Sequence, residues 1–507
     1  MARGRSKQVL FMKLKQQKWK EAAIRLLPLW TLIFAILLPV LDVAAYWQEV
    51  LEYKSALTTL LRLAMLGGTA MLGFWLSDRK RYYWMLAAVL GGFGVLRSLA
   101  LMQADYHFAG EDLRNLLFLF MLPVYTLSFC TFLRKNPRVQ KALFQGFGVD
   151  FFLVTGVMLL SWATGTDPYT YTNKQLGIRG WFLQGNAPSA ILSMLVPMAV
   201  GWALRRWPDK TLPVVTVTVI GEAALYFMAT RLSSASILGV GFGIGLSLLL
   251  LVARKNRRQG LSILAVTMAW AMLLTHSPMA ENQQSVDQAF SKNQEQFNLY
   301  AMMGYHGLTP ERRDERLAMA YNLYVPGLIS TFGPERTMEI YDRTTDTNVI
   351  CSRRTMRLNF CRLLQEDSPE SAKWFGMDIT RMKVEGVDLN WATGNREYMT
   401  TSFDPENDFH AVYYLYGMVG LFLVLAFFAY FAGRGLWAMC RDFKTHFTPE
   451  FAAVACACCT DLAHCIFTSS TLRRLNTEAY LAMVLALLWW LSRKELSPKR
   501  MKIPTPQ

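Results

Sequence analysis

A short polar stretch, Glu406 to His410, stands directly before a long apolar segment and carries side chains suited to proton transfer. Glu406, Asp408 and His410 supply carboxylate and imidazole groups, which can take a proton from a hydroxyl during catalysis. Asn407 lies between them and offers an amide for substrate binding. The stretch also ends the one long hydrophilic part of an otherwise apolar chain. This position predicts chemistry at a membrane face, on a substrate carried by lipid.

A second group of candidate residues consists of arginines that fall near the same predicted membrane face. They are Arg62, Arg97, Arg114, Arg179, Arg231, Arg473 and Arg474. An arginine at membrane depth is costly and usually faces a cavity or a partner. Because guanidinium groups bind phosphate through paired hydrogen bonds, the set predicts an anion site, for example for a diphosphate. Alternatively, each arginine reaches to the interface or pairs with an acid. The candidate acids are Asp42, Glu111, Asp112 and Glu222.

The elements that must position these residues are apolar helices. The chain has 507 residues, of which 53% are hydrophobic. A segment needs about 20 apolar residues to cross the bilayer core, and a helix satisfies its own backbone there. We therefore predict an all-α polytopic membrane protein with about twelve transmembrane helices. Their predicted ranges are 26–46, 56–77, 83–103, 114–133, 143–164, 187–204, 211–229, 236–253, 260–276, 409–432, 449–468 and 477–493.

Clusters of lysine and arginine set the orientation of these helices. One cluster precedes the first predicted span, and others follow every second span, so all of them fall on one side of the membrane. The positive-inside rule makes that side cytoplasmic and places both termini inside. The net charge of +16 is therefore explained by membrane orientation, and a nucleic-acid partner is not expected.

This orientation divides the chain of a multi-pass cell-membrane protein into five parts. They are a cytoplasmic basic segment (1–25), transmembrane helices one to nine (26–276), a large extracytoplasmic loop domain (277–407), transmembrane helices ten to twelve (408–493) and a cytoplasmic tail (494–507). The loop domain is expected to be mainly helical, with helices near Pro310–Leu323 and Ser352–Leu364.

Three features together carry a family resemblance. The first is the layout of twelve spans with the large outer loop between the ninth and the tenth. The second is the stretch from Arg179 to Ser189, RGWFLQGNAPS, which opens the sixth span and contains Asn186. The third is Asn407 followed by Gly417 and Gly420 at the tenth span. In these features the chain resembles the O-antigen ligase and O-antigen polymerase superfamily, which are membrane glycosyltransferases of the bacterial surface.

The chain departs from the superfamily pattern at two places. The superfamily's histidine falls at Glu406, and His410 lies one helical turn further on. If the helix has begun by Glu406, these two side chains share a face, and either can serve as the base. The superfamily's serine, arginine and glycine motif before the eighth span fits Thr230 to Ser236 only if Arg231 is displaced.

The resemblance implies an inverting glycosyltransferase that needs no metal or other cofactor. Its donor would be a glycan on a polyprenyl diphosphate in the membrane lipid, and its acceptor a hydroxyl of a glycan or glycolipid. His410 or Glu406 would be the base, with Arg179 and Arg231 as further catalytic residues. Substrate-binding residues would be Asn186, Asn407, Asp408, Arg62, Arg97, Arg473 and Arg474. A metal held by Asp404, Glu406 and Asp408 is the alternative.

Two functions from other classes compete with glycan transfer. A transporter or flippase of lipid-linked oligosaccharide would use carboxylates inside its spans, for which Asp150, Glu222 and Asp461 are candidates. Such proteins often contain internal repeats, and we find none between the two halves of this chain. A non-catalytic assembly protein would instead use the outer loop to bind a partner.

Overall fold

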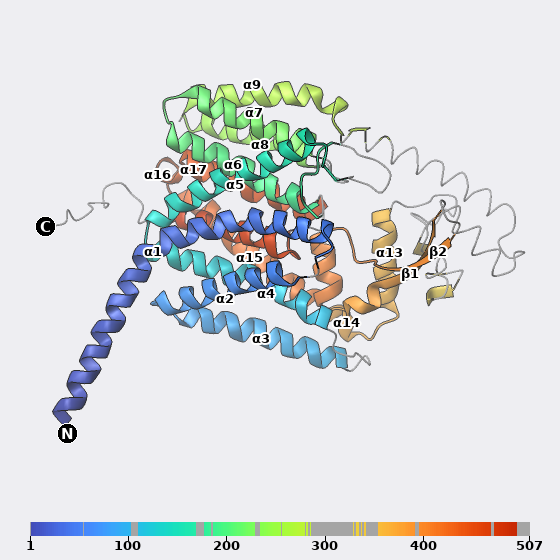
Figure 1. The fold of residues 1–507 in the computed structure, drawn as a ribbon, viewed down its shortest axis with the longest axis horizontal. Helices are drawn as coiled ribbons and strands as arrows, with labels where there is room; N and C mark the ends of the chain where they lie inside the picture. Colours follow the sequence, from blue (N-terminus) through green and yellow to red (C-terminus); the bar gives the residue numbers. More distant parts are fainter. Residues whose placement is uncertain are drawn as a thin grey trace, which may run out of the picture.

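The computed structural model describes residues 2–53, 55–102, 110–168, 177–183, 186–228, 234–254, 256–278, 353–390, 395–467 and 471–493, with short pieces between 280 and 340. Within these ranges the chain is a bundle of long helices, with a smaller group of helices and strands at one end (Figure 1). We call this end the loop end. The first helix begins at the opposite end of the bundle (Figure 1).

The bundle helices coincide with the segments predicted from the sequence. They are α1 (Ala2–Val50), α2 (Leu57–Leu76), α3 (Arg81–Met102), α4 (Gly110–Lys135), α5 (Arg138–Ala163), α6 (Asn186–Arg206), α7 (Thr211–Phe227), α8 (Ser234–Val252), α9 (Arg257–Leu273), α15 (Asp408–Arg441), α17 (Pro449–Phe467) and α18 (Leu475–Leu491). Nine of the described helices are long and apolar enough to cross a membrane, and α7, α8 and α18 contribute shorter apolar segments. A helical polytopic membrane protein is thus confirmed as the fold class, and the count of twelve spans stays a prediction.

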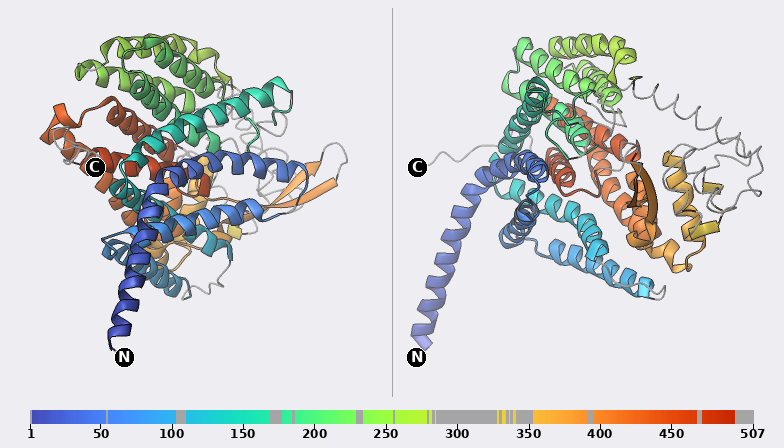
Figure 2. Two further views of the ribbon diagram at one scale, coloured as in Figure 1. Left: turned by 60° about the vertical axis from the view of Figure 1, so that its left-hand side comes forward. Right: turned by 45° about the vertical axis from the view of Figure 1, so that its right-hand side comes forward.

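Helices α6 and α18 form the buried centre of the bundle. Helix α6 packs against α5 and α17, and α18 packs against α4 and α17. Nearly every side chain of α18 is buried, as expected for a helix that is apolar on all sides. Helices α7, α8 and α9 cover one flank, and α2 and α3 lie on the other (Figures 1 and 2). The rigid centre therefore holds the first residues of α18 firmly at the loop end.

The described part of the outer loop combines helices with a β-hairpin. It contains α13 (Arg353–Glu366), α14 (Ser371–Phe375), a 3-10 turn η3 (Ile379–Met382), and strands β1 (Lys383–Asn390) and β2 (Asn395–Ser402). The strands are antiparallel and pair Lys383 with Ser402. A mainly helical loop was expected, and α13 covers the second of the two helices predicted there. The hairpin was missed, although apolar Val387 and Leu389 alternate with polar positions at the period of a strand. The predicted helix at 310–323 lies outside the described residues.

Helix α15 changes direction at Gly417, whose φ of 69° lies in the left-handed region. Glycine adopts this conformation without the steric penalty of a Cβ atom. A Cβ at Gly417 would lie 2.2 Å from the carbonyl carbon of Trp374, so α14 lies directly against the kink. The kink frees carbonyl oxygens, and the Met377 amide donates to one of them, on Tyr414, at 2.8 Å. The kink and the close approach of α14 thus explain why glycine occupies position 417, one of the residues that carry the family resemblance.

Replacing Gly417 with alanine is expected to destabilise the protein by at least about 2 kcal/mol. A left-handed alanine costs roughly 1–2 kcal/mol, and its methyl group would also overlap the Trp374 backbone. Thermal unfolding of the purified protein in detergent measures the effect. Gly433→Ala is the matched control, because a Cβ at Gly433, on the same helix, meets nothing within 4 Å. Equal melting temperatures for the two variants would show that the kink does not need glycine.

Candidate functional site

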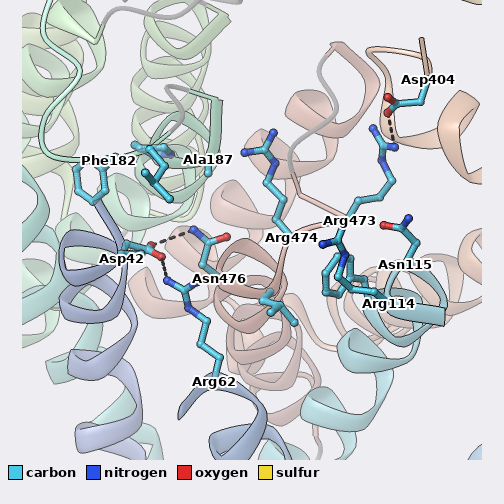
Figure 3. A pocket seen from close by; sticks show the side chains of 15 residues that line it. Asp42, Arg62, Arg114, Asn115, Phe182, Ala187, Asp404, Arg473, Arg474 and Asn476 are labelled. Atoms are coloured by element: carbon cyan, nitrogen blue, oxygen red, sulfur yellow. Dashed lines mark hydrogen bonds and ion pairs between the residues drawn. The ribbon is translucent and has the colours of Figure 1, made fainter. Parts of the chain in front are cut away.

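A polar cavity of about 410 Å³ opens at the loop end of the bundle (Figure 3). Six parts of the chain form its walls: the end of α1, the beginnings of α2 and α4, the segment that leads into α6 and its first turn, the segment between β2 and α15, and the turn that leads into α18. The lining residues are Asp42, Ala45, Arg62, Arg114, Asn115, Phe118, Phe182, Leu183, Ala187, Pro188, Asp404, Arg473, Arg474, Leu475 and Asn476. The cavity therefore brings together residues that are far apart along the chain.

Arginines outnumber acids in this cavity by four to two. Two of the arginines form ion pairs at opposite walls. Arg62 contacts Asp42 at 2.5 Å, and Asn476 donates a second hydrogen bond to Asp42 at 3.0 Å. Arg473 contacts Asp404 at 2.5 Å. Because each aspartate already has an arginine partner, the remaining positive charge of the cavity is available to an anion.

Arg474 lies between these two ion pairs in the view of Figure 3. Its guanidinium makes no hydrogen bond or ion pair with any residue that the structure describes. Burial, and then the adjacent Arg473 charge, lower the pKa of Arg474 to about 10. The group remains protonated at neutral pH, but its charge is poorly compensated. An anion in the cavity would relieve this repulsion, which makes Arg474 the strongest candidate for a ligand contact.

The opposite charges of Arg473 and Asp404 each favour the ionised form of the other group. Burial alone would raise the pKa of the Asp404 carboxyl, but the Arg473 charge and its hydrogen bond outweigh burial and lower it. Burial likewise opposes the charge of Arg473, and Asp404 and Asp408 together raise its pKa. Both groups are therefore ionised at neutral pH.

Asp408 shapes the turn that presents both arginines. Its carboxylate is fully buried and accepts hydrogen bonds from the backbone amides of Thr471 at 2.9 Å and Leu472 at 3.2 Å. Thr471 also donates its hydroxyl to Asp461 at 3.0 Å. The sequence predicts a substrate-binding role for Asp408. The geometry gives it a positioning role, because its contacts hold the turn before Arg473 and Arg474.

The other residues of the polar stretch lie beside the cavity and do not line it. The Asn407 side chain caps α15 by accepting a hydrogen bond from the His410 amide at 3.0 Å, and it donates to the Ile466 carbonyl of α17. Glu406 forms an ion pair with Arg357 of α13 at 3.5 Å. The His410 side chain is exposed on the first turn of α15. These contacts fix the start of α15 next to the turn that carries the arginines.

The remaining predicted site residues are separated from one another. The Arg179 backbone amide donates to Asp167, and its side chain, whose pKa is lowered by burial, does not line the cavity. Asn186 is the first residue of α6, directly before the lining residue Ala187. Arg231 lies outside the described residues.

Arg97 is buried in the bundle, at 1% exposure, and serves as a structural link. It pairs with Asp112 of α4 through both guanidinium ends, one of them at 2.8 Å. It also donates to the Leu415 carbonyl, just before the kink of α15, at 3.1 Å from Nε, and to the Met377 carbonyl at 3.2 Å. Arg97 is thus paired with an acid, which was the alternative to anion binding for these arginines. Arg62 is also paired with an acid, Asp42, but it lines the cavity as well.

Several residues that line the cavity are not among the site residues predicted from the sequence. Asp42 was weighed only as an ion-pair partner, although a carboxylate within the first apolar span is itself a signal of function. Arg114 was grouped with the outer arginines but was not assigned a binding role. Asn115 and Asn476 carried no signal apart from their position, next to Arg114 and just after Arg474.

Comparison with known proteins assigns the chain to a family. No curated protein matches the sequence. A family model described as an O-antigen ligase like membrane protein matches residues 26–491, a range that begins with the first apolar span and ends at the last residue of α18. Because the match covers most of the chain, the protein belongs to the family of O-antigen ligase like membrane proteins.

Proposed function

We propose that the protein transfers a glycan from a polyprenyl-diphosphate carrier to an acceptor hydroxyl at the outer face of the cytoplasmic membrane, in surface polysaccharide biosynthesis. The observation that carries this proposal is the cavity with four arginines at the loop end of a membrane bundle. Family membership supports a glycan-transfer role in the membrane. Guanidinium groups match the charge and the geometry of a diphosphate.

The proposed reaction divides the work between the arginines and a base. Arg474 and Arg473 bind the diphosphate and stabilise the negative charge that grows on it as the bond to the sugar breaks. The acceptor hydroxyl attacks the anomeric carbon from the opposite side, which inverts its configuration, and a base takes the hydroxyl proton. The arginines thus supply positive charge that a metal ion provides in many other diphosphate reactions.

Three residues are proposed as alternatives for the base. Glu406 and His410 remain candidates and would need the start of α15 to shift toward the cavity. Asp404 lines the cavity already. Its low pKa makes it a weak base while Arg473 pairs with it. When Arg473 turns to the diphosphate, that effect weakens and Asp404 becomes a stronger proton acceptor.

Gene deletion followed by lipid analysis tests the proposed function. A strain without the gene is expected to accumulate polyprenyl-diphosphate-linked glycan on the outer face of the membrane and to lose surface glycan. Purified protein, supplied with that extracted lipid and an acceptor, should then release polyprenyl diphosphate. Products with longer glycan chains would identify a polymerase, and attachment to a different acceptor would identify a ligase. Absence of release with every acceptor fraction of the same cell would contradict the proposal.

Buried carboxylates favour one second candidate, transport of the lipid-linked glycan. Asp150 in α5 and Asp461 in α17 are fully buried, and Glu222 in α7 is nearly so. Intramembrane carboxylates often serve in proton relays. Transport predicts that the deletion strain accumulates lipid-linked glycan on the cytoplasmic face, whereas transfer predicts the outer face. Accessibility of the glycan to an added glycosidase in intact spheroplasts separates the two functions.

A further inference from the structure

A second and larger cavity, of about 750 Å³, lies at the other end of the bundle. Helices α2, α4, α15 and α18 begin at the loop end, so their last residues lie at this opposite end, together with the first residues of α3. The lining residues are Ser77, Arg79, Tyr82, Met85, Leu86, Val89, Pro123, Thr126, Leu127, Cys130, Thr131, Arg134, Phe427, Tyr430, Phe431, Arg434, Trp489 and Arg493. We call this cavity the basic groove.

Helices α3 and α15 contact each other in their outer halves. There, Phe93 contacts the Tyr416 ring, and Arg97 donates to the Leu415 carbonyl. Toward the opposite end the two helices leave a space with mainly apolar walls. Met85 on α3 is 59% exposed and Tyr430 on α15 is 53% exposed, so the groove opens sideways at membrane depth. Its walls can therefore receive acyl chains directly from the bilayer.

Positive charge is concentrated at the end of the groove. Arg79, Arg134, Arg434 and Arg493 come from four different parts of the chain, and none of the lining residues is acidic. An adjoining cavity of about 240 Å³ shares Arg434 and Arg493 and adds Arg441, again without an acidic lining residue. This differs from the outer cavity, where two aspartates compensate two arginines.

Arg434 contributes to the groove a buried nitrogen, Nε, without a hydrogen-bond partner among the described residues. The carboxylate of Asp78, which precedes the lining residue Arg79 in the chain, is paired with Lys135 at 2.6 Å. A buried guanidinium nitrogen without an acceptor is costly, and a phosphate oxygen would satisfy it.

We propose that the basic groove binds an anionic phospholipid of the cytoplasmic leaflet, with its phosphate among the arginines and its acyl chains along the apolar walls. The positive-inside rule assigns the basic end of the bundle to the cytoplasm, and basic pockets between membrane helices on that side bind anionic headgroups. The ammonium group of a zwitterionic lipid would find no carboxylate among the lining residues. This site is separate from the proposed diphosphate cavity, because the two occupy opposite ends of the bundle.

Lipid titration of the delipidated, purified protein tests this site. Fluorescent phosphatidylglycerol is expected to bind at least about tenfold more tightly than phosphatidylethanolamine, since each arginine near a lipid phosphate contributes roughly 1 kcal/mol. Arg434→Gln should weaken phosphatidylglycerol binding about fivefold. Arg258→Gln is the matched control, an exposed arginine at the start of α9 that does not line the groove. It should bind phosphatidylglycerol like the unchanged protein.

A second variant keeps the proposal testable if Arg434→Gln fails to fold. Val89→Trp fills the apolar part of the groove while it leaves all the arginines in place, and Val89 is exposed enough to accept a larger side chain. It should also weaken phosphatidylglycerol binding. Equal affinity for the two lipids, or unchanged binding in both variants, would overturn the proposal. Because binding is the readout, the result is independent of glycan transfer.

Discussion

Arg474→Gln is expected to reduce the rate of glycan transfer by roughly 100- to 1,000-fold, the usual loss when one charge-stabilising donor is removed from an active site. Arg474, like Arg114, lines the cavity without an ion-pair partner among the described residues, so its removal leaves no acid unpaired. Removal also relieves repulsion with Arg473, and we therefore expect the folded protein to be no less stable. Release of polyprenyl diphosphate from the extracted lipid-linked glycan measures the rate, and thermal unfolding measures stability.

Two further variants make the Arg474 result interpretable. Arg381→Gln is the matched control, because Arg381 is an exposed arginine of the outer loop that contacts Ser368 at 3.2 Å and does not line the cavity. It should retain the unchanged rate. Arg473→Gln should lower both rate and stability, because it leaves the partly buried Asp404 carboxylate without its partner. If Arg474→Gln transferred glycan at the unchanged rate, a diphosphate at this position would be excluded.

The sequence predicted the helices well, because most bundle helices are apolar runs with basic residues at one end. It predicted the candidate site only in part. Arg62, Arg473 and Arg474 line the cavity, and Arg97 does not, although all of them were placed near the same membrane face. Membrane depth can be inferred from position along a span. The direction in which a side chain points depends on how each helix is rotated against its neighbours, and that is decided by tertiary packing.

Asp408 illustrates a second limit of inference from sequence. Its neighbours Glu406 and His410 favoured a role in substrate binding, whereas its carboxylate accepts hydrogen bonds from the backbone amides of Thr471 and Leu472, more than sixty positions further along the chain. A contact of this kind leaves no local pattern. The kink at Gly417 is different, because a glycine within a membrane span at a fixed spacing from Asn407 is visible in the sequence, and the close approach of α14 supplies its physical reason.

Arg97→Met is expected to destabilise the protein by about 3–5 kcal/mol, the usual cost of removing one partner from a buried ion pair. Asp112 is 2% exposed and would keep its carboxylate without a counterion inside the bundle. The carbonyls of Leu415 and Met377 would also lose their donor, so the kink of α15 would loosen. Thermal unfolding in detergent measures the loss.

The double variant Arg97→Met, Asp112→Leu separates the ion pair from the kink. Removing both charges takes away the unpaired carboxylate, and replacement of a whole buried ion pair by apolar side chains is often neutral or better. The double variant should therefore recover most of the stability lost in Arg97→Met, and it should fall short of the unchanged protein because the two carbonyls still lack a donor. Glycan transfer should recover along with stability, since Arg97 does not line the outer cavity. Full stability without transfer in the double variant would instead return Arg97 to the substrate-binding residues.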